Sequence, residues 1–386
     1  MHGRKISLYV HIPFCQSFCD YCSFPRIILS EPAILADYLK ALEAELHSLR
    51  NFLGARTVGT VYIGGGTPSA GGSEFVRRLV DLLVEQVDLT GTQEFTVECN
   101  PDDLNSSWAF LRDSPVTRIS LGVQTFQDPR SIGRRHTSEQ ARQAVRMLQD
   151  MGMGNISLDL IFGLPSSSIH TMEEDIREAH GLHPRHISFY GLSVDEGTKL
   201  HRRVCAGEIK VPDEEKWIGQ MEAGRRLLDD LGYKQYEISN FSIPGYESIH
   251  NLSYWTGGDY IGIGSGAASR AGCYRWYNPF PPDCYLNLDF SPWESFPPWA
   301  EEVEIITPQL LQNEMIMTGL RLKKGIPLES FQSGEHIEEA LRTFLASGHL
   351  EIENGRYRLT DRGVLVSDGI FSDLFATIDD TDLSLT

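Results

Sequence analysis

Three cysteines near the start of the chain have a spacing that is typical of metal binding. Cys15, Cys19 and Cys22 form a C-x3-C-x2-C motif directly after an apolar segment, so their thiolates can converge on one centre from a single loop. A cubane iron–sulfur cluster is usually held by four cysteines, and this motif supplies three. Catalytic metal sites keep one coordination position open for a small molecule. The pattern therefore predicts a [4Fe-4S] cluster whose fourth iron takes an exchangeable ligand.

A zinc knuckle and ordinary packed cysteines are the two other interpretations of this motif. Zinc requires a fourth ligand at a short, recognisable spacing. The nearest candidate is His11, at the end of an apolar segment, so the cluster is favoured. The remaining cysteines look incidental; they are Cys99, Cys205, Cys273 and Cys284.

The cysteine usage and the composition predict a cytoplasmic protein. Seven cysteines, an odd number with three of them clustered, fit a reducing compartment better than a disulfide framework. The sequence has no apolar run approaching about 18 residues and no signal-peptide pattern before the motif. Its 386 residues, of which 41% are hydrophobic, suffice for two or three domains.

The charge balance argues against a polyanionic partner. The formal net charge is -19, from 34 basic and 53 acidic side chains, and such a chain repels nucleic acid unless a local basic patch overcomes the repulsion. The clearest basic cluster, Arg134-Arg135-His136, is short and suits one small anionic ligand. We therefore expect no binding of nucleic acid.

Strands and helices alternate through the first half of the sequence. Short β-branched runs are separated by longer stretches with helical spacing, which predicts parallel strands with crossover helices and an α/β fold. The six predicted strands are 7–11, 60–64, 94–98, 118–123, 155–161 and 186–190. The predicted helices are 32–53, 73–88, 138–152 and 170–181, with a weaker one at 103–113.

Polar or glycine residues follow each of these strands. In an α/β barrel such positions meet around one cavity mouth, so six of them in register favour a site over isolated core polar groups. The glycine run 64–66 would let backbone groups approach a ligand, but it lacks the spacing of a phosphate or dinucleotide loop. The strand-end residues are His11, Gly64 to Thr67, Glu98 with Asn100, Gln124, Asp159, and Tyr190 with Ser193.

The second half departs from this alternation. A helix is expected at 213–231, and a Gly- and aromatic-rich stretch at 255–272 reads as loops and strands that close the side of the barrel. A Pro- and Trp-rich linker at 280–299 marks a boundary. Beyond it, helices at 308–322 and 335–347 precede a hairpin around Asn354-Gly355, which suggests a winged-helix-like domain. The predicted divisions are 1–195, 196–285 and 286–386.

Taken together, these motifs resemble the radical S-adenosylmethionine superfamily, and within it the anaerobic coproporphyrinogen III oxidase family. The resemblance covers nearly the whole chain and implies a partial (β/α)6 TIM-like barrel with a smaller C-terminal helical, winged-helix-like domain. Besides the cysteines, the stretches that carry it are 62–68, 98–101, 120–126, 133–136, 158–165, 235–241 and 250–255.

Two branches of that family differ in function: one decarboxylates coproporphyrinogen III, and the other, the HemW-like branch, comprises haem chaperones. The oxidase motif continues to a further cysteine, where this chain has Phe24, and the oxidase has a longer segment before the cluster than the fourteen residues here. The element His250-Asn251-x-x-Tyr254-Trp255 matches one that is associated with haem binding in the chaperone branch. These features favour the chaperone.

The resemblance implies a role for each matching position. Cys15, Cys19 and Cys22 would hold the cluster, and the amine and carboxylate of S-adenosylmethionine would bind its open iron. His250 is the candidate axial ligand of haem, with His11, His136 and His201 as weaker alternatives. The residues expected to line the S-adenosylmethionine site are Tyr9, Tyr21, Gly65, Gly66, Thr67, Glu98, Gln124, Arg134 and Asp159.

We therefore expect a haem chaperone that carries a [4Fe-4S] cluster and S-adenosylmethionine and passes haem to an acceptor protein. The alternatives are an oxygen-independent coproporphyrinogen III oxidase, which would use a 5′-deoxyadenosyl radical, and a non-catalytic iron–sulfur interaction module. Radical chemistry would require an electron donor such as flavodoxin or ferredoxin. Contact with a membrane would be peripheral and through the acceptor only. The sequence leaves open the acceptor, catalysis, a second S-adenosylmethionine site, covalent haem attachment and the oligomeric state.

Overall fold

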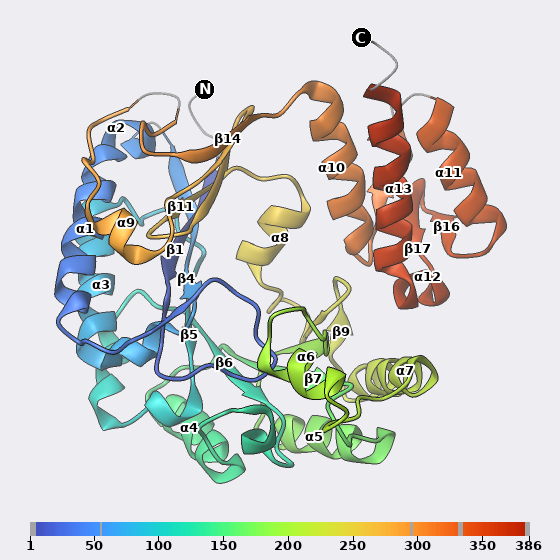
Figure 1. The fold of residues 1–386 in the computed structure, drawn as a ribbon, viewed down its shortest axis with the longest axis horizontal. Coiled ribbons are helices and arrows are strands. Elements are labelled where there is room, and N and C mark those ends of the chain that lie inside the picture. Colours follow the sequence, from blue (N-terminus) through green and yellow to red (C-terminus); the bar gives the residue numbers. More distant parts are fainter. Residues whose placement is uncertain (1–4, 55, 294–295, 331–334, 383–386) are drawn as a thin grey trace.

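The fold is built on one large, mostly parallel β-sheet, seen in a computed structural model that describes residues 5–54, 56–293, 296–330 and 335–382 (Figure 1). Six neighbouring strands of this sheet run parallel. They confirm the six predicted strands, with bounds that differ by three residues or fewer. These strands are β1 (Lys5–Ile12), β4 (Thr57–Gly65), β5 (Glu94–Cys99), β6 (Arg118–Gln124), β7 (Ile156–Phe162) and β8 (His186–Gly191).

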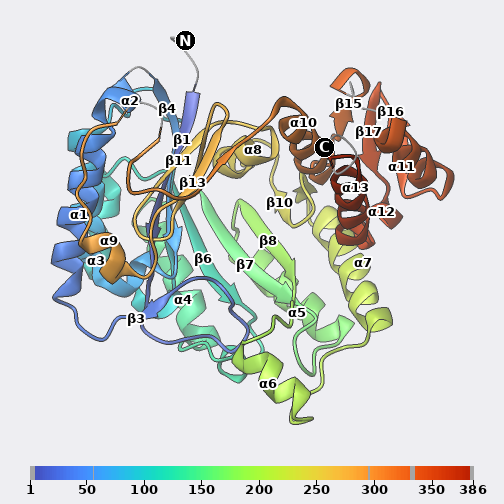
Figure 2. The ribbon, with the colours of Figure 1, turned by 45° about the horizontal axis from the view of Figure 1, so that its top comes forward.

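Crossover helices connect these strands and lie along the outer side of the curved sheet (Figure 2). The predicted helix 32–53 is two helices, and the predicted helix 103–113 is a 3₁₀ helix, Ser106–Asp113. Thr137 caps α4 by accepting a hydrogen bond from the backbone N–H of Gln140. The crossover helices are α1 (Ile34–Ser48), α2 (Arg50–Gly54), α3 (Gly72–Gln86), α4 (Ser138–Asp150) and α5 (Ile169–Gly181).

Both edges of the parallel sheet are extended by later strands. Strand β11 (Tyr260–Ile263) runs parallel to β1, so the glycine- and aromatic-rich stretch continues the sheet beside the first strand. Beyond it follow the antiparallel strands β12 (Ala268–Ala271), β13 (Tyr274–Tyr277) and β14 (Glu301–Ile305). At the other edge, β10 (Asn240–Ser242) and β9 (Lys234–Gln235) follow β8.

Helices flank the open side of the sheet and form most of the C-terminal part. Figure 1 shows α8 (Ile249–Trp255) between the strands and α10 (Pro308–Arg321). The predicted hairpin is present as β16 (Leu350–Glu353) and β17 (Arg356–Leu359), paired with β15 (Ile326–Pro327). The other elements are β2 (Phe14–Cys15), β3 (Ile27–Ile28), α6 (Lys199–Cys205), α7 (Glu214–Asp230), α9 (Pro282–Leu286), α11 (Glu335–Ala346), α12 (Asp361–Leu365) and α13 (Ser367–Asp382).

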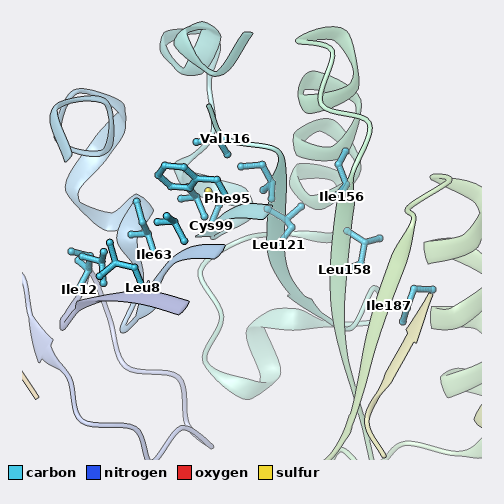
Figure 3. Close-up of a cluster of buried hydrophobic side chains, with 14 of the residues drawn as sticks. Leu8, Ile12, Ile63, Phe95, Cys99, Val116, Leu121, Ile156, Leu158 and Ile187 are labelled. Carbon is cyan, nitrogen blue, oxygen red and sulfur yellow. The ribbon is translucent and has the colours of Figure 1, made fainter. Parts of the chain in front are cut away.

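The main core lies between the parallel strands and the crossover helices (Figure 3). Leu8, Ile63, Phe95 and Leu121, from four successive strands, have no exposed surface. Burying such a side chain contributes about 1.5–3 kcal/mol, so this layer fixes the strands whose ends build the site. In the described part of the chain, no helix is long and apolar enough to cross a membrane.

Candidate functional site

The cysteine loop is held in place from two sides. Short strands β2 and β3 pair with each other at the base of the loop. At its far side the carboxylate of Asp20, which is 4% exposed, accepts from Lys199 Nζ at 3.0 Å and from Arg203 Nη1 at 3.1 Å, both on α6. The Asp20 carbonyl accepts from the backbone N–H of Leu200 at 2.7 Å. Helix α6 therefore positions the loop that presents the cysteines.

All three cysteines line one cavity with a volume of about 470 Å³, which continues along the carboxyl ends of β4 to β8. The structure thus brings together most of the residues that the sequence singled out. The predicted site residues that line this cavity are Cys15, Cys19, Cys22, Tyr21, Gly65, Gly66, Thr67, Glu98, Gln124, Arg134 and Asp159.

Cys15 is buried, whereas Cys19 and Cys22 are partly buried, and the thiols have few polar partners. Burial raises the pKa of Cys15 to about 11, although a hydrogen bond to Thr67 Oγ1 at 3.7 Å opposes the shift. Arg134 Nη1 lies 3.4 Å from Cys19 Sγ. A metal centre would have to displace the thiol protons on binding. Among the described residues, no group of three His, Cys, Asp or Glu side chains is arranged to hold a single metal ion.

Two glycines bring backbone close to the cysteine loop. A Cβ on Gly66 would lie 2.9 Å from the Phe14 carbonyl oxygen and 3.1 Å from Cys15 Sγ, so a side chain does not fit there. Gly65 has a φ of 120°, which L side chains rarely adopt. The glycine run thus lets the backbone pass directly against the cysteine loop, where the N–H groups of Gly65 and Gly66 donate to Glu98 and to the Ile12 carbonyl.

Glu98, at the end of β5, is a carboxyl group with a raised pKa. Burial raises the pKa to about 7, although Tyr62 Oη donates to Oε1 at 2.6 Å and the Gly65 N–H donates to Oε2 at 3.2 Å. The group therefore changes its charge near neutral pH. It can accept hydrogen bonds from the hydroxyl groups of a ligand once it is ionised.

Asp159 and Gln124 come from adjacent strands. Burial raises the pKa of Asp159 to about 6, and Ser120 Oγ donates to Oδ1 at 3.2 Å. The pairing of β6 with β7 shifts register between Gly122 and Gln124, and Gln124 has a φ of 71°. Such a bulge re-aims a side chain next to a site, and here Gln124 lines the cavity.

Arg134 joins the cysteine loop to the strand ends. Besides Cys19, its guanidinium contacts the Gly122 carbonyl at 2.6 Å and the Asn100 side chain. Among the described residues, its Nε has no hydrogen-bond partner although it is buried. A buried donor without a partner is costly, and this one lies in the wall of the cavity. The three thiols and this donor therefore fit an iron–sulfur cluster with a ligand that carries an anionic group.

Tyr9 and His250 lie outside the cavity. Tyr9 Oη bonds to His11 Nδ1 at 2.9 Å. His250, which is 1% exposed, uses both ring nitrogens, Nδ1 to Thr60 Oγ1 and Nε2 to Tyr254 Oη, each at 2.8 Å. Burial lowers the pKa of His250 to about 3, so the ring is neutral at pH 7.

The N-terminus of α8 explains why His250 is buried. The carboxylate of Glu94 accepts hydrogen bonds from Ser248 Oγ and from the backbone N–H groups of Ile249 and His250, at 2.8–3.1 Å. The negative charge also lies where the helix dipole favours it. Glu94, the first residue of β5, thus fixes α8 to the sheet, an arrangement that sequence spacing alone does not reveal.

Sequence reasoning missed several residues of the cavity, among them Arg26 and Asp195, and it pointed to Arg135 only as part of a basic cluster. Ser23 Oγ donates to Asp195 Oδ2 at 2.6 Å, which joins the cysteine loop to the segment after β8. These residues do not lie at the ends of predicted strands, so the strand pattern of the sequence does not indicate them. Phe24 also lines the cavity, although the sequence pointed to it only as the position of an absent cysteine.

Comparison with known proteins places this architecture in a family. The Radical SAM superfamily profile matches residues 9–179, and the HemN C-terminal domain profile matches residues 306–366. A protein of Lactococcus lactis subsp. lactis named Heme chaperone HemW is 35% identical over 384 residues, which cover 96% of this chain and 97% of the relative. The chain belongs to the HemW family.

Further HemW proteins support this placement. The Bacillus subtilis protein is 33% identical and covers 95% of this chain and 98% of its own length. The Escherichia coli HemW is 36% identical over a shorter region, 69% of this chain. The family resemblance predicted from the motifs is thereby confirmed, in favour of the HemW-like branch.

A solved structure confirms the fold of this HemW family member. The coproporphyrinogen III oxidase HemN from Escherichia coli, described as a radical SAM enzyme, superposes with a TM-score of 0.81 and covers 96% of this chain and 90% of HemN. The sequence identity is 20%, so the likeness establishes the α/β architecture alone.

Proposed function

We propose that this chain is a haem chaperone, which binds haem and transfers it to an acceptor protein. The observation that carries the proposal is the match to proteins named Heme chaperone HemW along nearly the full length of the chain. We place the protein in the cytoplasm, with the acceptor unknown and with peripheral contact to a membrane through that acceptor only.

Within the cavity, we assign Cys15, Cys19 and Cys22 as the ligands of a [4Fe-4S] cluster and the adjoining strand ends as the site of S-adenosylmethionine. If radical chemistry occurs, a bound cluster would supply one electron to the sulfonium of S-adenosylmethionine. The cluster would receive that electron from a donor such as flavodoxin or ferredoxin. The convergence of three thiols on one cavity, one of them buried and two partly buried, supports the assignment.

The residues around the cluster would orient the cofactor and shield it. Gly66 allows the backbone to pass close beside Cys15. Glu98, once ionised, would accept from the ribose hydroxyls, and Asp159 adds a second carboxyl group on the same wall. Arg134 would hold the side of the cluster at Cys19. Gln124, Thr67 and Tyr21 complete the wall.

His250 is proposed as the axial ligand of haem. To reach an iron, its ring would have to exchange the hydrogen bond to Thr60 or to Tyr254 for the metal. The neutral imidazole favours ligation, because a protonated ring cannot bind a metal. Haemin bound to His250→Ala should lose the optical signature of histidine ligation and dissociate at least tenfold faster, whereas an unchanged spectrum would remove His250 from this role.

The second candidate function is oxygen-independent coproporphyrinogen III oxidation, the activity of the other branch of the family that the motifs resemble. The exposed Phe24 stands where the oxidase motif has a cysteine. An anaerobic incubation of the reconstituted protein with S-adenosylmethionine, a reductant and coproporphyrinogen III separates the two functions. The chaperone proposal predicts no decarboxylated product, and catalytic turnover would establish the oxidase instead.

A further inference from the structure

Large aromatic side chains stay exposed at the mouth of the cavity. Phe24 and Tyr190 both line the cavity and are 68% and 40% exposed, and Phe18, on the same loop as Phe24, is 48% exposed. We call these three residues the aromatic rim. Single exposed apolar residues are ordinary, but several around one opening mark a surface that a ligand or partner covers.

An arginine is fixed within the aromatic rim. The guanidinium of Arg26 lies over the Phe18 ring, with Cζ 4.7 Å from the ring centroid, and it donates to the carbonyl oxygen atoms of Cys22 and Phe24. Because these bonds hold the arginine in the loop, its positive charge stays beside exposed aromatic surface at the edge of the cavity.

The residues that line the cavity include both apolar and polar side chains. Leu192 and Tyr190 line the same cavity as Phe24, together with Glu98, Asp159 and other polar groups. The nearby carboxylate of Asp195 already accepts from Ser23 and Ser193. The cavity thus combines exposed aromatic side chains and the guanidinium of Arg26 with polar groups.

We propose that the aromatic rim binds the porphyrin ring of haem, with Phe24 and Phe18 against the ring and Arg26 near a carboxylate at its edge. A planar ligand with apolar faces and anionic carboxylates matches this combination of surface and charge. The inference rests on the proposed haem chaperone function and names where that ligand first meets the protein. His250 is too deeply buried to make this first contact.

Metal-free protoporphyrin IX tests the aromatic rim apart from iron ligation. The reconstituted full-length protein is titrated with protoporphyrin IX under anaerobic conditions, and porphyrin fluorescence is followed. The double variant Phe18→Ser/Phe24→Ser is compared with Ile305→Ser, which removes an apolar side chain of similar exposure, 66%, from β14. The iron content of each protein confirms that the cysteine loop still holds the cluster.

The double variant should bind protoporphyrin IX at least tenfold more weakly than the wild type, and Ile305→Ser should stay within twofold. Equal affinities for the wild type and the double variant would overturn the inference and leave the aromatic rim to another partner, such as the acceptor protein. A parallel titration of the wild type with haemin separates the two proposals: haemin binding with no effect of the double variant refutes only the aromatic rim. Failure of the wild type to bind either ligand refutes the chaperone function and the inference together.

Discussion

Within the cavity, burial decides which residues carry charge. Glu98 and Asp159 are acidic groups whose pKa values burial raises to about 7 and about 6, so Glu98 changes its charge near neutral pH and Asp159 changes its charge at slightly lower pH. Their protonation states therefore depend on what binds beside them. A cationic ligand, or one that donates hydroxyl groups, favours the ionised form.

The affinity for S-adenosylmethionine should rise with pH through the pKa of Glu98. The ligand is a sulfonium cation with a ribose diol, so it prefers the carboxylate, and the fraction of carboxylate grows as pH increases through about 7. For a single group of this pKa, the affinity should increase about tenfold between pH 6 and pH 8. Equilibrium dialysis of the reconstituted protein measures this change.

Glu98→Gln provides the control for this pH dependence, because the amine of the ligand titrates in the same range. The variant should bind S-adenosylmethionine more weakly and lose most of the change in affinity with pH. A wild-type profile that coincides with that of Glu98→Gln would show that Glu98 does not contact the ligand.

The three cysteines should each be necessary for the cluster. Because the motif supplies no fourth thiolate, replacing Cys15, Cys19 or Cys22 by serine should lower the bound iron from about four atoms per chain to below one. Cys205→Ser, at an exposed position on α6, should keep the full iron content. Anaerobic reconstitution followed by iron analysis checks this, and a single variant that retained the cluster would argue against the ligand set.

Among the structural elements, the strand ends were predictable and the helix α8 was not. The six strands follow from β-branched runs, because a buried parallel strand needs apolar residues on both faces. Their polar ends follow from the same pattern. The burial of His250 depends instead on Glu94, 156 residues earlier in the sequence, which holds the N-terminus of α8. Such a distant contact leaves no local signal.

Local geometry explains the other differences between prediction and structure. Tyr9 belongs to β1, whose predicted position is correct, but its hydroxyl group faces His11 instead of the cavity. Residues 106–113 have helical spacing, yet they form a 3₁₀ helix of eight residues, which is longer than is usual for this conformation. The division of the chain at 195 and 285 stays a prediction.

A side chain at Gly66 should disturb the junction between β4 and the cysteine loop. In Gly66→Ala the new Cβ would press on the Phe14 carbonyl, a backbone atom that cannot move aside cheaply, at a cost of about 1–3 kcal/mol. We expect a lower melting temperature and at least tenfold weaker binding of S-adenosylmethionine.

Gly154→Ala is the matched control for this substitution. No heavy atom of the described residues beyond its chain neighbours lies within 4 Å of a Cβ at that position, so thermal unfolding and ligand affinity should match the wild type. If Gly66→Ala behaved like Gly154→Ala, close packing at the junction would not be required for binding.

In the molecule as a whole, helix α8, which contains His250, contacts both the parallel sheet and the C-terminal part of the chain. Arg321, at the end of α10, lies over the Trp255 ring at the end of α8, with Cζ 4.5 Å from the ring centroid. It also pairs with the buried Glu237 at 3.7 Å. Helix α8 is therefore held by Glu94 at its first turn and by Arg321 at its last turn. Tyr62, which contacts the His250 ring and donates to Glu98, lies between His250 and the carboxyl group that lines the cavity.

The central claim is that this chain binds haem as a chaperone while it carries the cluster of its superfamily. The most direct test is an anaerobic titration of the reconstituted protein with haemin, followed by optical spectroscopy. We predict saturable binding of about one haemin per chain, as for a single specific site, with the iron–sulfur absorption retained. Haemin that binds without saturation, or no better than to an unrelated protein, would contradict the account.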